Sequence, residues 1–360
     1  MPNLKFSQFQ EKTDPANVQF VVGYNGTDNV RIAPGNISGG AAYPFLIDTA
    51  SLYSGFVPSS LSGNPQGNTV LGIDAGASIT SANTCTIIGS NAGNLVTTGN
   101  RQTIVGHDAG SSITTSGSNT IFGYEAGKGI SGSSDRNVVV GDMACRTSAG
   151  DDNVAIGSSA GYSWNNAVGD AVAIGSFASS ASNGATGMIA IGRKSARTNI
   201  WPYHISIGYE AGYSNTSGSS NTNIGYKAGY STTTGLSNTT LGYNTLGYHN
   251  GNNNVAIGTD AMKGSVSFTG TGDGNVAIGF NAGSGSSPTA FSNSILIGRD
   301  AASSPIGQSN FIVLGNSSHT TLQIPGIQSG ASDGDVLTFN SSAGKLELQA
   351  AGGGGASSLN

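Results

Sequence analysis

The chain is poor in the residues that build most active sites. Charged residues make up 9% of its 360 residues and aromatic residues 7%, and there are only four histidines. The histidines lack the spacing of metal ligands, so no metal site is expected. No convergent set of titratable groups is apparent, which argues against an enzyme and against a bound cofactor. With a net charge of −5, a nucleic-acid partner is not expected either; the richest basic spot is Arg193, Lys194 and Arg197.

Long apolar runs and paired cysteines are also missing. The first residues carry no apolar segment of the kind found in signal peptides, and no stretch has the length of a transmembrane helix. We therefore expect no insertion into a membrane. Cys85 and Cys145 are the only cysteines. They lie several repeats apart, beyond disulfide reach, and we expect them to be buried small residues in a protein assembled in a reducing cytoplasm.

What the chain does contain is a short repeat between residues 68 and 315. A unit of roughly 17 residues recurs about fifteen times, with an apolar pair, a glycine, two variable residues and usually alanine. Clear copies read NTIFGYEAG (119–127), NVAIGSSAG (153–161) and NVAIGFNAG (275–283). The repeat glycines are Gly72, Gly89, Gly106, Gly123, Gly141, Gly157, Gly175, Gly192, Gly208, Gly225, Gly242, Gly258, Gly279, Gly298 and Gly315.

The repeat predicts a short strand followed by a turn. In residues 153–157 Val154 and Ile156 alternate with Asn153 and Ala155, which is the period of a strand. We expect Val154 and Ile156 to lie on the inner face, so that stacked repeats bury a column of Val, Ile and Leu. The glycine then permits a sharp bend or a positive φ. This structural role is assigned to Gly157, Gly208, Gly225, Gly242, Gly258 and Gly279.

A recurrent asparagine stands four residues before the glycine, as in Asn153, Asn221 and Asn254. Stacked amides at equivalent positions form a hydrogen-bonded ladder or close a turn, and a structural role is expected for them. The chain is thus predicted to be all-β, a parallel β-roll or β-solenoid of about fifteen repeats. Because one such chain encloses a thin core, we expect a homotrimeric fibre in which three chains share a seam lined by small residues.

These phrases resemble the head repeats of trimeric autotransporter adhesins, with their NxxxIGxxA signature. They are still more similar to the IGYxAGY repeats of phage tail fibres, as in residues 207–213 and 224–230. Residues 5–32 resemble the amino-terminal segment of structural proteins from marine cyanophages. Residues 311–322 and 332–348 resemble phage fibre segments. The resemblance implies a virion fibre made in the host cytoplasm and exposed on the particle, and it gives a bacterial trimeric surface adhesin as the alternative.

Composition and repeats divide the chain into five parts. Residues 1–45 are predicted to be a small β module, with a hairpin around Asn25 and Gly26, that docks onto other virion proteins. Residues 46–67 are expected to cap the shaft, which comprises residues 68–315. Residues 316–350 close the other end, where 335–340 and 345–349 are expected to pair as a hairpin. Residues 351–360 form a glycine-rich linker or tail.

The candidate functional residues are aromatic. The position directly after the repeat glycine holds Tyr209, Tyr226 and Tyr243, and the fifth position after it holds Tyr213 and Tyr230. Adjacent repeats should align them in two columns. With Trp201 and Tyr203 these residues are candidates for contact with a host-surface polysaccharide, since rings stack on sugar CH groups. The alternative is a purely structural aromatic ladder.

Two other functional patterns are weak. Residues 157–161 match a G-x-S-x-G nucleophile motif, but Ser159 merely occupies a variable slot of the repeat and no helix follows. An ice- or crystal-binding solenoid would require a flat, regular threonine array. The threonines at 69, 103, 120 and 239 are expected to shift between repeats, which argues against that function.

Overall fold

The computed structural model describes residues 46–48, 51–54, 65–318, 336–340 and 345–349, with gaps at 133, 148, 166–167, 183–185, 200, 265–270, 285–290 and 302–308. Over these residues the chain is all-β and has no helix; accordingly, none of sufficient length and hydropathy to cross a membrane occurs there. The chain divides into two compact units, Met1–Asn137 and Val138–Asn360. The predicted docking module at 1–45 and the tail at 351–360 lie outside the described residues.

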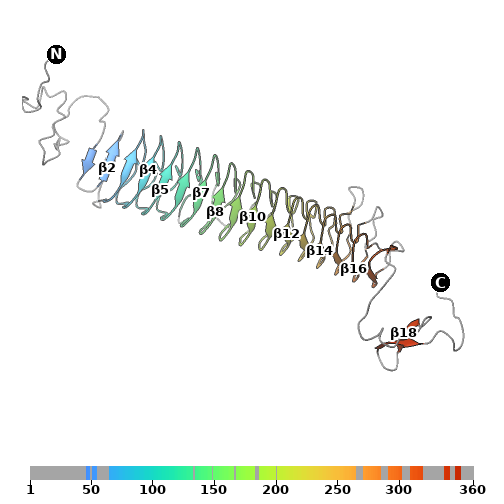
Figure 1. Ribbon diagram of the computed structural model, residues 1–360. Helices are drawn as coiled ribbons and strands as arrows, with labels where there is room; N and C mark the ends of the chain where they lie inside the picture. The colour runs from blue at the N-terminus through green and yellow to red at the C-terminus, as the bar shows by residue number, and fades with distance from the viewer. Residues whose placement is uncertain are drawn as a thin grey trace, which may run out of the picture. The chain divides into compact units, whose positions relative to one another are not determined.

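The first unit contains the start of a β-solenoid. Strand β1 (Leu46–Asp48) pairs antiparallel with β2 (Ser51–Ser54), and β2 pairs in parallel with β3. From β3 onward, three-residue strands stack in parallel, 17 residues apart and in register (Figure 1). These strands are β3 (Thr69–Leu71), β4 (Thr86–Ile88), β5 (Thr103–Val105) and β6 (Thr120–Phe122).

The second unit repeats the same construction and ends in a separate hairpin. Its solenoid strands pair in parallel with their sequence neighbours. As predicted, β18 (Val336–Asn340) pairs antiparallel with β19 (Lys345–Gln349). The solenoid strands are β7 (Val138–Val140), β8 (Val154–Ile156), β9 (Val172–Ile174), β10 (Ile189–Ile191), β11 (Ile205–Ile207), β12 (Thr222–Ile224), β13 (Thr239–Leu241), β14 (Val255–Ile257), β15 (Val276–Ile278), β16 (Ile295–Ile297) and β17 (Ile312–Leu314).

The strands face the opposite way from the prediction. In β8 the middle residue, Ala155, is fully buried, whereas Val154 and Ile156 are only half-buried and point outward. The same burial pattern holds from β3 to β16. It leaves the larger aliphatic side chains outward where the middle residue is small, as in β8, β9 and β10, whereas in β3 to β7 the buried middle residue is itself Val or Ile. The predicted column of buried Val and Ile is thus present at the middle positions of β3 to β6, where Val70, Ile87, Ile104 and Ile121 stack in register, but the inward assignment of Val154 and Ile156 is wrong. In a strand of three residues only the middle side chain points inward, because successive side chains alternate between the two faces.

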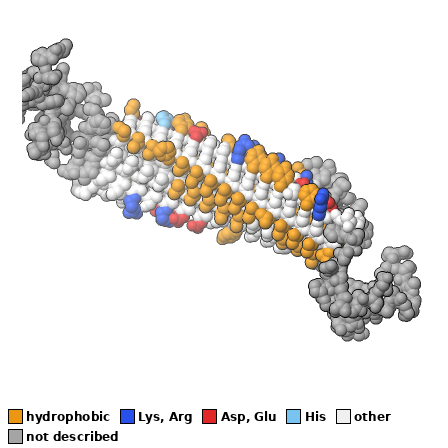
Figure 2. Space-filling view, viewed as in Figure 1, with side chains coloured by type: hydrophobic (Ala, Val, Ile, Leu, Met, Phe, Trp, Pro, Cys, Tyr) orange, Lys and Arg blue, Asp and Glu red, His pale blue; other side chains and the backbone are white. Residues whose placement is uncertain are grey.

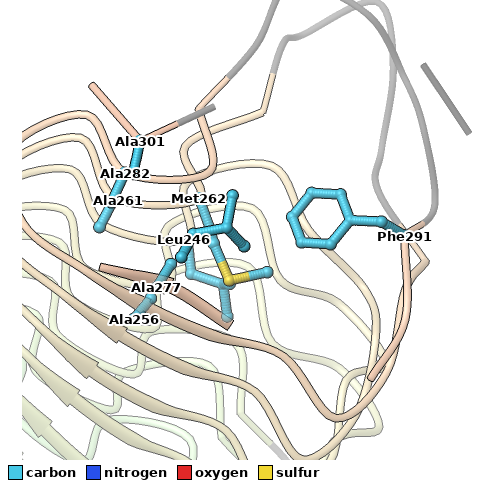
Figure 3. Packing of buried hydrophobic residues seen from close by; sticks show 9 residues of the cluster. Leu246, Ala256, Ala261, Met262, Ala277, Ala282, Phe291 and Ala301 are labelled. Carbon is cyan, nitrogen blue, oxygen red and sulfur yellow. The ribbon is translucent and has the colours of Figure 1, made fainter. Parts of the chain in front are cut away.

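Small residues form another column of the interior, beside larger buried side chains such as Ile104 and Trp164. The third position after the repeat glycine is buried and is usually alanine, as in Ala160 and Ala211. Near the end of the solenoid the stacked alanines Ala261, Ala282 and Ala301 belong to one buried cluster with Leu246, Met262 and Phe291 (Figure 3). The small residues expected to line a seam between chains thus lie inside a single chain, where they allow the strand and the turns to approach closely.

The asparagine ladder is present in the form expected, and it also closes the turns. Asn153 Nδ2 donates to the carbonyl of Val168 at 2.9 Å. Its Oδ1 accepts from the backbone amide of Ala171 in the next rung, where a rung is one turn of the solenoid. Asn221 and Asn254 repeat this arrangement, with Nδ2 donating to Gly235 at 2.6 Å and to Gly272 at 3.0 Å. Each buried amide is therefore satisfied by backbone groups of its own rung and the next.

The repeat glycines adopt a backbone conformation that other residues rarely reach. In Gly157, Gly208, Gly225, Gly242, Gly258 and Gly279 φ lies between 124° and 142°. A Cβ atom at Gly242 would lie 2.6 Å from the carbonyl oxygen of Gly258. Glycine is thus required both by the bend and by the contact with the next rung.

The threonines are more regular than predicted. Thr69 pairs with Thr86, Thr86 with Thr103 and Thr103 with Thr120, so four threonines form one in-register outward column in the first unit. The expectation that they shift between repeats is wrong. The adjacent outward column nevertheless holds Leu71, Ile88, Val105 and Phe122. This face is therefore not the flat array of threonine that a crystal-binding surface requires.

Both cysteines are buried and neither forms a disulfide, as predicted. Burial raises the pKa of the Cys85 thiol and raises that of Cys145 to about 12. Both therefore stay protonated near neutral pH and are poor nucleophiles.

The middle of the second unit has an unusually polar interior. The inward residues of β11, β12 and β13 are Ser206, Asn223 and Thr240, all buried. His249 is buried nearby, and its Nδ1 accepts a hydrogen bond from the amide of Gly251 at 3.1 Å. Burial lowers the pKa of His249 to about 4, with Asp273 acting in the opposite direction. The imidazole is therefore neutral at pH 7, with its Nδ1 lone pair engaged.

We predict that this histidine makes the solenoid sensitive to acid. Its pKa in the fold lies below its ordinary value of 6.5, so the unfolded chain binds the proton more readily. The contribution of the neutral imidazole to the free energy of unfolding is therefore complete above pH 6.5 and is lost as the pH falls toward 4. Urea unfolding at pH 7, 5.5 and 4 should show that the free energy of unfolding falls less in His249→Asn than in the wild type. Asparagine suits this position, because Asn199 and Asn215 occupy the equivalent position of other repeats. Equal declines in both proteins would contradict this assignment.

Candidate functional site: two stacked tyrosine columns

The candidate site is built on the turn that follows each strand. Two residues after each repeat glycine from Gly72 to Gly298 the backbone is left-handed, with φ of 58° at Lys194, 53° at Glu210 and 53° at Lys227. These values recur at the same slot from rung to rung, so side chains at equivalent positions come to lie one above another. The residue at this slot varies from repeat to repeat. The sequence therefore does not indicate the left-handed conformation, which residues other than glycine seldom adopt.

The first tyrosine column consists of Tyr209, Tyr226 and Tyr243. The rings of Tyr209 and Tyr226 stack at 5.2 Å between centroids with 9° between planes, and those of Tyr226 and Tyr243 at 4.9 Å and 5°. Tyr226 remains 40% exposed and Tyr243 52% exposed. Because the ring faces cover each other, the outward contacts available to the middle ring are its edge and its hydroxyl.

The second column consists of Tyr213 and Tyr230, whose ring centroids lie 5.2 Å apart with 17° between planes. The next rung has Gly247 at the equivalent slot, so this column ends without a further side chain. Burial, and next Glu210, raise the pKa of the Tyr230 hydroxyl, which therefore remains a hydrogen-bond donor. Both columns that the spacing predicts are thus formed.

An arginine begins each column, one rung before its first tyrosine. Arg193 lies 5.6 Å from the centroid of the Tyr209 ring and donates to its hydroxyl at 3.1 Å. Arg197 lies 5.5 Å from the centroid of the Tyr213 ring and donates to its hydroxyl at 2.7 Å. The three basic residues of this rung are evident in the sequence, but their contact with the columns was not predicted. The signal was available, since both arginines occupy the slots that the tyrosines occupy one rung later.

A ladder of alternating charge runs between the columns. Glu210 carboxylate oxygens lie 3.7 Å from Nζ of Lys194 and 3.7 Å from Nζ of Lys227. Lys227 Nζ also lies 5.5 Å from the Tyr226 centroid and 5.0 Å from the Tyr230 centroid, so it bridges the two columns. Sequence reasoning missed this ladder; the alternation of sign at one slot of successive rungs would have indicated it.

Trp201 and Tyr203 do not join the columns. Tyr203 lies two residues before β11 begins, whereas Tyr209 lies two residues after it ends. A strand of three residues spans about 10 Å, so the two tyrosines flank opposite ends of the strand. Both Trp201 and Tyr203 are exposed, at 46% and 67%. Trp164 is fully buried and donates to Ser179 at 2.8 Å, so it is a core residue.

The geometry of the columns is that of an aromatic ladder. Stacked rings, guanidinium groups and the charge ladder give a rigid surface with hydroxyls and ring edges outward. Over the part of the chain that the structure describes, no group of three or more His, Cys, Asp or Glu is placed to hold a metal ion.

We predict that the middle tyrosine of the first column contributes most to stability. Tyr226→Ala removes two ring stacks, which together are worth about 1–3 kcal/mol. Tyr243→Ala removes one stack and should lower the free energy of unfolding by about half as much. Urea unfolding of both variants measures the difference. Equal or negligible losses would mean that the rings do not support one another.

Comparison of this chain with protein-family models, with curated proteins and with solved structures finds no match in any of the three.

Proposed function

We propose that this chain is a structural, non-catalytic fibre protein that assembles as a homotrimer on a bacteriophage particle. It would serve as a tail fibre or capsid-mounted fibre that extends toward the host surface. A rigid β-solenoid of stacked rungs suits such a role, since its length grows by about 4.8 Å with each strand added. Three identical copies would present every surface contact three times, so that weak contacts with the host add as avidity.

The observation that carries the proposal is an apolar surface left uncovered by the single chain. In the second unit the eleven residues directly before the repeat glycines are all Val, Ile or Leu, and the first strand position holds Val or Ile in nine of eleven strands. Figure 2 shows hydrophobic side chains gathered in rows along the rungs. Exposure reaches 47% at Leu241 and 57% at Leu314.

Continuous apolar rows of this extent are typical of surfaces that bind another protein. A second copy of the same chain is the occupant that fits best, because an identical solenoid offers rows with the same rung spacing. Contacts between different faces of identical chains close into rings, and three chains form a small closed ring. The seam would be lined by these outward Val, Ile and Leu residues rather than by the small residues, which lie inside each chain.

The assignment to a phage rests on the resemblance of residues 5–32, 311–322 and 332–348 to phage structural proteins. We propose a cyanophage as the source, with the segment at 1–45 docking onto other virion proteins. The fibre would then be made in the host cytoplasm and exposed on the particle. A bacterial trimeric surface adhesin is the competing function, and the experiments below distinguish the two.

We predict that charges placed on the apolar rows prevent assembly. Ile207→Lys combined with Ile224→Lys puts two cations into the proposed seam, where desolvation is costly. These side chains point outward from β11 and β12, so the single chain should still fold. Sedimentation equilibrium should give three chain masses for the wild type and one for the double variant. Ser217→Lys, at an exposed position outside the strands, is the matched control and should remain trimeric. A monomeric wild type, or a trimeric double variant, would refute the seam.

We also predict that cryo-electron microscopy of intact virions beside the purified assembly shows a threefold rod on the particle. The point of attachment would then distinguish a tail fibre from a capsid fibre. A rod absent from virions, together with export of the protein to a bacterial surface, would instead establish the adhesin.

A further inference from the structure

The two tyrosine columns and the charged residues beside them form one continuous surface in the second unit. It combines stacked pairs of tyrosine rings with four cations on neighbouring rungs. We call it the Arg–Tyr strip, and it consists of Arg193, Lys194, Arg197, Tyr209, Glu210, Tyr213, Tyr226, Lys227, Tyr230 and Tyr243.

The strip is positively charged on a chain that is negatively charged as a whole. It holds four cations and one carboxylate, while the full chain has a net charge of −5. Glu210 is nearly buried, with its side chain 9% exposed, and its carboxylate forms ion pairs with Lys194 and Lys227. Within the described residues, neither Arg193 nor Arg197 forms an ion pair with a carboxylate. Two guanidinium charges therefore remain uncompensated on this surface.

Both guanidinium groups are held in place with most of their donors free. Each makes one hydrogen bond, to a tyrosine hydroxyl in the next rung, and lies over that tyrosine ring. A guanidinium group carries five N–H donors. Nε of Arg197 is buried and has no partner. Since the rings fix their orientation, the two arginines lose little conformational entropy when they bind an anion.

The rest of the strip suits a sugar chain. Tyrosine edges and hydroxyls repeat along the columns at about 4.8 Å per rung, a spacing at which one pyranose ring can be placed on each rung. At the end of the second column Gly247 leaves the far side of Tyr230 without a side chain stacked on it at that slot. Guanidinium groups bind carboxylate and sulfate oxygens through paired hydrogen bonds, whereas neutral sugars offer no such partner.

We propose that the Arg–Tyr strip binds an acidic polysaccharide, with Arg193 and Arg197 contacting its carboxylate or sulfate groups and the tyrosine columns contacting its sugar rings. This deepens the proposed function, and it rests on that function only for its biological setting. The cations occupy two turns of the solenoid rather than a long track, so a nucleic acid, with its continuous phosphate backbone, is the less suitable polyanion.

The test is direct binding by the purified full-length chain in its assembled state. Fluorescein-labelled alginate, a polyuronate, serves as the probe, labelled dextran as the neutral control, and duplex DNA as a competitor, all followed by fluorescence polarisation. We expect binding to alginate that weakens as salt is raised, no binding to dextran, and displacement by unlabelled alginate but not by DNA. Arg193→Gln combined with Arg197→Gln should weaken alginate binding about tenfold or more.

Arg146→Gln is the matched control. Arg146 makes the same contact with Tyr162 as the strip arginines make with their tyrosines, at 3.1 Å to the hydroxyl and 5.8 Å to the ring centroid, but lies outside the strip. This variant should bind alginate like the wild type. Equal binding by the double variant, equal binding to dextran, or displacement by DNA would each overturn the inference. A fibre seen on virions without alginate binding would overturn this inference alone, whereas alginate binding by a chain absent from virions would overturn only the fibre.

Discussion

In-register stacking of identical turns is the constraint on which this structure depends. Each strand pairs with its neighbours without any offset, and the repeat glycines approach so closely that a side chain there would strike the next rung. Every slot of the repeat therefore becomes a column running through successive rungs. A side chain must therefore be compatible with the side chains at the same position of the turns before and after it. Asparagine meets this requirement through its amide, tyrosine through its ring, and charged residues by alternating in sign.

Much of the fold follows from the sequence for this reason. A fixed period with a glycine at each repeat predicts stacked turns, and the alternation in residues 153–156 predicts the strand β8. The inward face could not be predicted in the same way, because alternation defines two faces and does not label them. Both carried apolar residues, Ala155 on one and Val154 and Ile156 on the other. Size indicated the larger pair as core, whereas the structure places the middle residue inward whether it is small, as Ala155 in β8, or large, as Ile87 in β4.

The candidate site was predictable in part. Tyr209, Tyr226 and Tyr243 share one slot, so stacking followed from the period alone. The contacts of Arg193, Arg197 and Glu210 depend on side-chain conformation and on an uncommon left-handed backbone at the slot between the columns. Trp201 and Tyr203 shared only their proximity in sequence with the columns, and a strand separates Tyr203 from Tyr209. Residues that share a slot were assigned correctly, and residues that are merely close in sequence were not.

The rung register also bears on how such a chain changes during evolution. Between Gly258 and Gly279 the spacing grows to 21 residues, yet β14 and β15 still pair Val255 with Val276. Extra residues are thus accommodated outside the strands without disturbing the columns. Duplication or loss of a whole unit would likewise preserve every neighbour relation. Genetic recombination between repeats can therefore alter the number of turns in one step, while single-residue changes alter only the surface that each turn displays.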